Sequence, residues 1–172
     1  MAVHRALLLL GSNLGDRAEA LASARSRLAA TAGRVVAVSR VYESEPWGVF
    51  AAGEEPSPFL NQAVGLETSL DPLALLDATQ RIERELGRAE HGPEYDAVTG
   101  GRVYRPRTLD IDMLFYDSAI LRLSRLTVPH PRLVERRFAL EPAAELWPDY
   151  LHPERKIALK ELFNSFLLGD SR

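Results

Sequence analysis

The sequence contains no cysteine, only two lysines and no long apolar run. Without cysteine, this sequence can form no disulfide, thiolate nucleophile or thiolate metal site. No apolar stretch approaches the roughly 18 residues of a membrane-spanning helix. The N-terminal apolar run Ala6–Leu10 is also too short for the core of a signal peptide. We therefore predict a cytoplasmic protein that does not bind membranes.

A large excess of charge of either sign is also missing, because the net charge is −3 over 172 residues. That balance argues against general nucleic-acid binding. The length suits one domain with a substantial core, so we expect residues 1–172 to form a single domain. We also expect a monomer. The basic residues are nevertheless clustered: Arg102–Arg137 holds eight arginines and four acidic residues. Because arginine suits bidentate phosphate binding, this segment is a candidate phosphate-binding region, and codon bias would not explain the clustering.

The segment Thr108–Tyr116 alternates in the manner of a β-strand. Alternation places four apolar side chains on one face: Leu109, Ile111, Met113 and Phe115. Asp110 and Asp112 then share the other face, starting about 6.6 Å apart, which suits one divalent cation or two cations about 3.5–4 Å apart. A solvated edge-strand face is the alternative, but aspartate is depleted in strands. Arg105 and Arg107, directly before this strand, favour a site that binds a metal and a polyanion.

Hydrophobic periodicity and turn residues predict the other elements. In order, they are a strand over Ala6–Leu10, a helix over Arg17–Ala30, strands over Val35–Tyr42 and Phe59–Thr68, a helix over Asp71–Leu86, the aspartate strand, a hairpin over Ala119–Val128 and a closing helix over Lys156–Leu168. This α+β order, βαββαβ, is typical of the ferredoxin-like plan. We expect an antiparallel sheet with helices on one face, plus a C-terminal hairpin and helical extension. The other face is then left for a site formed by Asn61 and the two aspartates.

Three loops leave alternatives open. The glycine-rich turn after the first strand could bind phosphate, but it is neither a G-x-G-x-x-G motif nor a P-loop, so we favour a turn and a helix cap. Trp47 and Phe50 lie in a loop over residues 46–58 that could either close over a flat ligand or pack on the core. The loop Arg88–Pro106 is long enough to suggest a functional role, so we interpret it as a closing lid.

Several motifs occur together in a fixed order. They are Leu10–Asp16, Tyr42–Gly48, Phe59–Val64, Arg105–Asp112 and Leu126–Arg132 followed by Arg136–Phe138. In this combination the sequence strongly resembles the 6-hydroxymethyl-7,8-dihydropterin pyrophosphokinase family of folate biosynthesis. The resemblance runs from the first strand to about Leu146, and the block RPRTLDID followed by VPHP is specific to it.

The resemblance implies an enzyme, a 2-amino-4-hydroxy-6-hydroxymethyldihydropteridine diphosphokinase, that transfers diphosphate from ATP to the pterin hydroxymethyl group and releases AMP. It implies ATP as co-substrate and two Mg²⁺ ions held by Asp110 and Asp112. The implied catalytic residues are Arg88, Arg107, Asp110 and Asp112. The implied ATP-binding residues are Gln80, Glu83, Arg88, Arg107, Ile111, Arg125, Thr127, His130 and Arg136. The implied pterin-binding residues are Ser44, Pro46, Trp47, Phe59, Asn61, Tyr104 and Phe138.

Two other functions are open on the residues alone. A metal-dependent phosphodiesterase or nuclease could use the same aspartate pair, but it would need a water-activating base and a broad basic groove. An RNA-recognition sheet would need aromatic residues on its central strands. Diphosphoryl transfer fits better, because it depends on charge neutralisation and in-line positioning rather than on a covalent nucleophile. One departure from the family is the acidic character of the loop after Arg88, which carries Glu90, Glu94 and Asp96.

Overall fold

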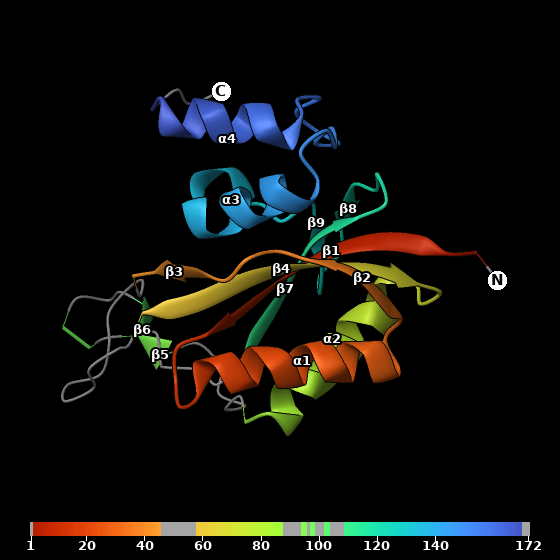
Figure 1. Ribbon diagram of the computed structural model, residues 1–172, viewed down its shortest axis with the longest axis vertical. Coiled ribbons are helices and arrows are strands. Elements are labelled where there is room, and N and C mark those ends of the chain that lie inside the picture. The colour runs from red at the N-terminus through yellow and green to blue at the C-terminus, as the bar shows by residue number, and fades with distance from the viewer. Residues whose placement is uncertain are drawn as a thin grey trace.

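The centre of the fold is one antiparallel sheet. The computed structural model describes residues 2–45, 58–87, 94–95, 97–98, 102–103 and 109–169. The sheet has the strand order β2-β4-β1-β7, and the short β3 pairs with β4 (Figure 1). Its strands are β1 (His4–Ser12), β2 (Arg34–Val38), β3 (Tyr42–Ser44), β4 (Phe59–Thr68) and β7 (Asp110–Tyr116). Two separate pairs are β5 (Glu94–Tyr95) with β6 (Arg102–Val103), and β8 (Leu121–Arg122) with β9 (Thr127–Val128).

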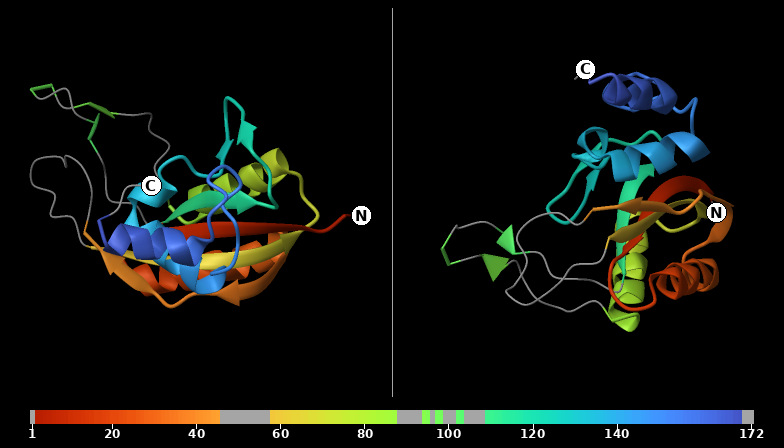
Figure 2. Two further views of the ribbon diagram at one scale, coloured as in Figure 1. Left: turned by 90° about the horizontal axis from the view of Figure 1, so that it is seen from above. Right: turned by 60° about the vertical axis from the view of Figure 1, so that its left-hand side comes forward.

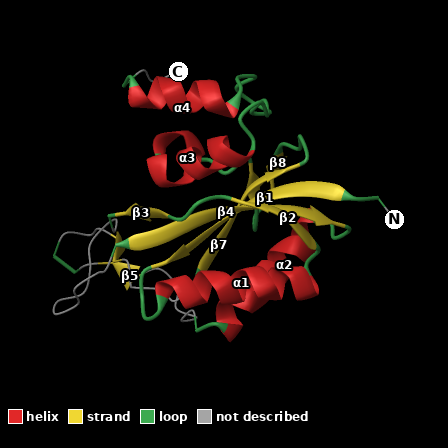
Figure 3. Ribbon diagram, in the orientation of Figure 1, coloured by secondary structure: helices red, strands yellow, loops and turns green. Residues whose placement is uncertain are grey.

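Two helices, α1 (Arg17–Thr31) and α2 (Pro72–Glu85), lie on one face of the sheet (Figure 3). Each begins at an aspartate whose side chain accepts a backbone N–H of the first turn: Asp16 caps α1 and Asp71 caps α2. Their apolar faces bury the alternate residues of the strands, including Leu8 and Leu10 of β1. This layer is the one predicted from the sequence. Among the described helices, none is long and apolar enough to cross a bilayer.

The C-terminal part of the chain covers the centre of the opposite face. A short 3₁₀ turn (Leu133–Glu135) leads into α3 (Arg137–Leu146), which packs on the sheet, and α4 (Leu159–Leu167) packs on α3. Figure 2 shows both helices on the side of the sheet away from α1 and α2. Leu7 and Leu9 of β1 are buried beneath α3. The antiparallel sheet, hairpin and helical extension are therefore as predicted, with α3 covering part of the face that was expected to be open.

A β-bulge in β7 changes which face its last residues occupy. Leu7 pairs with Phe115 and Leu8 pairs with Met113, so Leu114 is an extra residue in the ladder. The prediction that Phe115 shares a face with Met113 is wrong, because an extra residue interrupts strict alternation and Phe115 packs in the α3 cluster. Ile111 and Met113 do lie on the α1–α2 side, as expected.

Candidate active site

A row of three residues crosses the sheet at the end of β1. Gly11 is paired with Asn61 of β4 on one side and with Asp110 of β7 on the other. We call these three residues the Gly11 row. Two pairs back along β1, Leu9 lies opposite Asp112. Directly opposed residues in a ladder project from the same face, and Leu9 is buried on the α3 side. The register therefore places Asn61 and both aspartates on that face, as the alternation predicted.

Because Gly11 has no side chain, the space between Asn61 and Asp110 is open. A Cβ atom at this position would lie 3.4 Å from Asn61 Oδ1 and 3.6 Å from Cδ1 of the Phe59 ring. The amide oxygen and the aromatic ring therefore both border the space above the glycine. A glycine in a strand often marks a place where a ligand approaches the backbone closely. This row can accommodate the edge of a flat ligand where any other residue would fill the space.

The amide of Asn61 has a fixed orientation. Asn61 is 2% exposed, and its Nδ2 donates to Ser44 Oγ at 2.8 Å and to the Tyr42 carbonyl oxygen at 3.3 Å, both on β3. With Nδ2 occupied by β3, Oδ1 is the amide atom that borders the space over Gly11. An amide oxygen held in this way is suited to accept an N–H from a heterocycle.

The two aspartates lie half-buried on β7, on either side of Ile111. Their hard oxygen donors suit Mg²⁺, which typically binds one or two carboxylates and takes its other ligands from phosphate and water. Within the described part of the chain, no group of three acidic, histidine or cysteine side chains is arranged to hold a metal. Two carboxylates on one face are the kind of protein ligand that such an ion takes.

His130 makes two hydrogen bonds, of which the first holds it beside β7. Its backbone N–H donates to the Leu114 carbonyl oxygen at 3.0 Å, and its ring Nδ1 accepts the backbone N–H of Arg132 at 3.3 Å. Because Nδ1 is an acceptor in this arrangement, the proton of the neutral ring resides on Nε2. His130 is thus prepared to donate a hydrogen bond from Nε2.

Burial, together with the cations of Arg136 and Arg132, lowers the pKa of His130 to about 4, and Asp110 only partly opposes this shift. The pKa of the His130 ring is therefore sensitive to Asp110, one of the two metal-binding candidates. At neutral pH the ring is therefore uncharged. A neutral donor can bind phosphate or a purine without adding to the positive charge already present.

Arg136 and Phe138 come from the start of α3, and the Arg136 guanidinium lies over the Phe138 ring, 5.6 Å from its centroid. Phe138 also lines a cavity of about 470 Å³ between β3, α3 and α4. Ser44 and Tyr42 form part of the opposite wall of this cavity. An aromatic ring that borders both a cation and a cavity can stack on a flat ligand.

A second group of predicted residues assembles where α2 meets the β8–β9 hairpin. Arg125 pairs with Asp77 Oδ1 at 2.5 Å and donates to Gln80 Oε1 at 3.3 Å. Thr127 lies exposed on β9. The family resemblance groups Gln80, Arg125 and Thr127 but does not include Asp77, whose only signal in the sequence is its position one turn before Gln80 on α2.

This geometry agrees with a match to a known family. The family model for 7,8-dihydro-6-hydroxymethylpterin-pyrophosphokinase (HPPK) matches residues 7–148. The chain belongs to this family. Similar proteins include the 2-amino-4-hydroxy-6-hydroxymethyldihydropteridine pyrophosphokinase of Porphyromonas gingivalis, 42% identical over 148 residues that cover 86% of this chain and 92% of the relative. The corresponding Bacillus subtilis protein is 42% identical over 142 residues, covering 82% and 77%.

Solved structures show the HPPK fold at lower identity. A crystal structure of HPPK-DHPS in complex with substrates superposes on 98% of this chain with a TM-score of 0.71 and 16% identity. Wild-type HPPK-DHPS of Plasmodium falciparum with STZ-DHP gives a TM-score of 0.73 over 97% of this chain, also at 16% identity. This chain spans 44% of each of those longer chains. At this identity the likeness shows the fold alone.

Family membership confirms the prediction of a pyrophosphokinase of folate biosynthesis and its α+β fold. Of the predicted site residues, Ser44, Phe59, Asn61, Asp110 and Asp112 lie together around the Gly11 row. Five predicted site residues lie outside the described residues: Pro46, Trp47, Arg88, Tyr104 and Arg107. Sequence reasoning missed Gly11, because its motif was interpreted as a turn and cap rather than as the floor of a site.

Proposed function

We propose that the Gly11 row is the place where the pterin and the ATP phosphates meet. Asn61 lies on one side of the glycine and Asp110 on the other, in register on one face. The proposal rests on these neighbouring positions, because a pterin bound at Asn61 would have its substituent directed towards a metal-bound phosphate at Asp110. Gly11 provides the room between them.

On the pterin side, the Asn61 amide oxygen accepts a hydrogen bond from the ring, and Phe59 and Phe138 provide aromatic faces. Pterin is flat and carries donors and acceptors on its edge, so one oriented amide and aromatic stacking suit it. The Ser44 hydroxyl acts through Asn61, because it accepts the Nδ2 hydrogen bond that orients the amide. Pro46, Trp47 and Tyr104 remain predicted pterin contacts.

On the nucleotide side, we assign Asp110 and Asp112 as ligands of two Mg²⁺ ions. Bound Mg²⁺ would neutralise phosphate charge and orient the triphosphate for in-line displacement. Neutral His130 donates from Nε2, and Arg136 provides a cation next to it. Gln80, Arg125 and Thr127 line the ATP site where α2 meets the hairpin, and Arg88 and Arg107 remain predicted phosphate ligands.

Glu83 and Ile111 belong to the same proposed ATP site, but their contacts indicate a supporting role. The Ile111 side chain is 6% exposed and lies in the core beneath the aspartates. Its backbone N–H donates to Glu83 Oε2 at 2.9 Å. This contact fixes the segment of β7 that carries both metal-binding candidates.

The proposed reaction joins the hydroxymethyl oxygen of the pterin to the β-phosphorus of ATP, and the bond from that phosphorus to the α-phosphate oxygen breaks. AMP is the leaving group, and the pterin diphosphate is the product. The protein contributes positioning and charge neutralisation, so no covalent intermediate on a side chain is needed. We propose further that residues 1–172 work as a single-domain, cytoplasmic monomer whose partners are these small molecules rather than nucleic acid or membrane.

The test is product analysis with ATP, Mg²⁺ and 6-hydroxymethyl-7,8-dihydropterin. AMP and the pterin diphosphate are the expected products, and formation of ADP would reject the assignment. Asp110→Asn and Asp112→Asn should each lower kcat by about 10²–10³-fold, as expected when transition-state charge loses its stabilisation. The matched control is Asp117→Asn, which removes a carboxylate next to the far end of β7 that binds His4 at 2.6 Å. Asp117 has a φ of 48°, a conformation that asparagine tolerates, so this variant should remain active.

A further inference from the structure

A three-residue cluster joins β3 to the last turn of α3. The Tyr42 hydroxyl donates to Glu145 Oε1 at 2.5 Å. Arg40 binds the same carboxylate twice, through its backbone N–H to Oε2 at 3.0 Å and through Nε to Oε1 at 3.1 Å. The Arg40 guanidinium also donates to the Tyr42 hydroxyl at 3.0 Å and lies over its ring. We call Arg40, Tyr42 and Glu145 the β3–α3 clamp.

The negative charge of Glu145 would by itself destabilise helix α3. Glu145 is the second-last residue of α3, where the helix dipole disfavours a negative charge. Burial works to raise the pKa of Glu145, but the hydrogen bonds from Tyr42 and Arg40 outweigh burial and lower it. The carboxylate therefore stays charged because its partners on the β3 side hold it. The interaction between the two elements, rather than the helix alone, accounts for a glutamate at this position.

Tyr42 connects this clamp directly to the pterin side of the site. Its hydroxyl reaches α3, while its backbone carbonyl accepts the Asn61 Nδ2 hydrogen bond at 3.3 Å. The next alternate residue of β3, Ser44, accepts the other Asn61 hydrogen bond. A shift of β3 relative to α3 would therefore rotate or release the Asn61 amide.

The clamp supports a short strand at the edge of the sheet. β3 is three residues long and pairs with β4. The cavity of about 470 Å³ lies between β3 and the first turns of α3, so packing does not join them there. The clamp is at the other end of α3 and sets the spacing between Ser44 on β3 and Phe138 on α3.

We propose that Tyr42 and Glu145 are positioning residues for the pterin, which they orient through β3 and Asn61. This inference rests on the proposed pterin site. It predicts that loss of the clamp weakens pterin binding while ATP binding, which depends on β7, α2 and the hairpin, is preserved.

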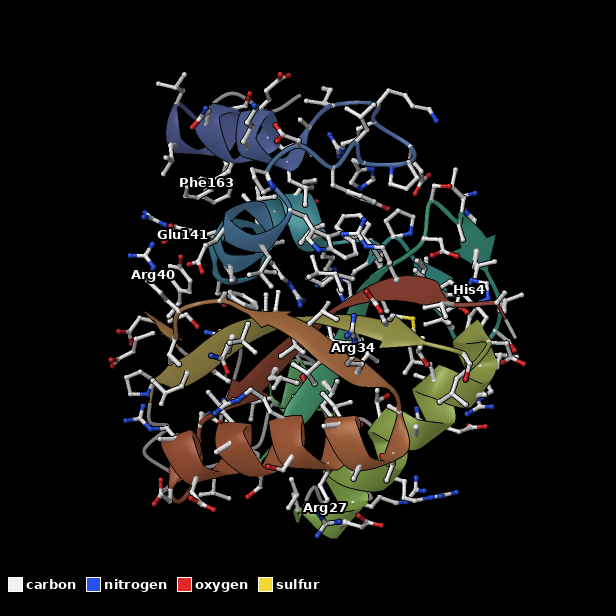
Figure 4. All side chains as sticks on the ribbon, turned by 45° about the vertical axis from the view of Figure 1, so that its right-hand side comes forward. His4, Arg27, Arg34, Arg40, Glu141 and Phe163 are labelled. Carbon is white, nitrogen blue, oxygen red and sulfur yellow. The ribbon has the colours of Figure 1, made fainter. Side chains whose placement is uncertain are left out.

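A surface ion pair elsewhere on the sheet is the matched control. Arg34 on β2 binds Glu67 on β4 at 3.1 Å, and both side chains are partly exposed, as in the clamp. Figure 4 shows Arg34 projecting from β2, apart from Arg40. Glu67→Gln removes a comparable ion pair from β4 without a link to Asn61.

The experiment compares Tyr42→Phe, Glu145→Gln and Glu67→Gln with the wild type and with Asn61→Ala. Pterin affinity is measured in the presence of α,β-methylene ATP, and the KM for ATP and the thermal midpoint are measured in parallel. The two clamp variants should bind the pterin at least about 5-fold more weakly. This corresponds to a loss of about 1 kcal/mol of binding free energy when the Asn61 amide is no longer held in its orientation. Their KM for ATP should change less than twofold, and Glu67→Gln should bind the pterin as the wild type does.

Two outcomes would overturn the inference. Clamp variants with wild-type pterin affinity, alongside an Asn61→Ala variant that has lost it, would show that β3 holds Asn61 without the clamp. Equal losses of pterin and ATP affinity together with a lower thermal midpoint would show a general structural role. Failure of the proposed function would look different, because the wild type itself would then not bind the pterin.

Discussion

The Glu83 carboxylate accepts the backbone N–H of Ile111, with 2.9 Å between Oε2 and N. Glu83 comes from α2 and is 2% exposed, so this bond lies in the interior. β7 is the last strand in the sheet order, and among the described strands none lies next to its outward N–H at Ile111. The carboxylate takes the place of such a strand and fixes the backbone between Asp110 and Asp112.

Glu83→Ala should lower the free energy of unfolding by about 1–3 kcal/mol, because a buried backbone N–H loses its acceptor. The same variant should need more Mg²⁺ for half-maximal activity, since the two aspartates lose their alignment. Glu83→Gln keeps an acceptor at the position and should be less affected on both measures. Urea unfolding and a Mg²⁺ titration of activity test this prediction, and an alanine variant equal to the wild type in both would contradict it.

Gly11→Ala should impair pterin binding more than it impairs folding. The added Cβ would make ordinary contacts of 3.4 and 3.6 Å, so the strand can tolerate it, but it would occupy the floor between Asn61 and Asp110. We expect the KM for the pterin to rise by about tenfold, corresponding to about 1.4 kcal/mol. Steady-state kinetics provide the measurement.

Gly65→Ala is the matched control for that change. Gly65 lies on the same face of β4 as Asn61, and its added Cβ would lie 3.5 Å from the Ala37 Cβ, away from the site. Its pterin KM should equal that of the wild type. If both alanine variants weaken pterin binding equally, the special role of Gly11 is excluded.

The low pKa of His130 has a consequence for stability. Its pKa is about 4 in the folded protein against 6.5 for an unperturbed histidine, so between these values the unfolded chain binds more protons. The stabilisation due to the neutral ring is fully present above pH 6.5 and is lost as the pH falls towards 4. His130→Gln removes this dependence, which is at most about 1.4 kcal/mol per pH unit for one proton.

Urea unfolding of the wild type and of His130→Gln between pH 4 and 7 measures the effect. The wild type should lose stability with falling pH more steeply than the variant. NMR titration of the ring protons gives the pKa directly, and a value near 6.5 would contradict the buried, neutral state.

His152 should prove structural rather than catalytic. Its Nδ1 accepts the backbone N–H groups of Glu154 and Arg155, both at 3.2 Å, and its ring packs edge-on against Phe115. Burial lowers the pKa of His152, which keeps this acceptor unprotonated. His152→Ala should cost about 1–3 kcal/mol of unfolding free energy, with kcat unchanged below the unfolding transition. A large drop in kcat with normal stability would show that this turn affects the site.

The two long helices and the aspartate strand could be predicted from local pattern. Helices α1 and α2 begin at aspartate caps and carry apolar residues at helical spacing, and the strand of Asp110 and Asp112 alternates, so each element is encoded within its own segment. The bulge at Leu114 could not be predicted in this way. An extra residue in a ladder depends on pairing with β1, and local alternation contains no information about it.

The sequence by itself determined the family motifs, the aspartate pair and the assignment of Asn61 to one face of its strand, because side-chain alternation is a local property of the backbone. Only the tertiary structure decided that Gly11 lies between Asn61 and Asp110, that Arg125 meets Asp77 and that Tyr42 reaches Glu145. These contacts join residues between 48 and 103 positions apart, or depend on strand register. Register and helix docking are set by the packing of the whole core, which no single segment specifies.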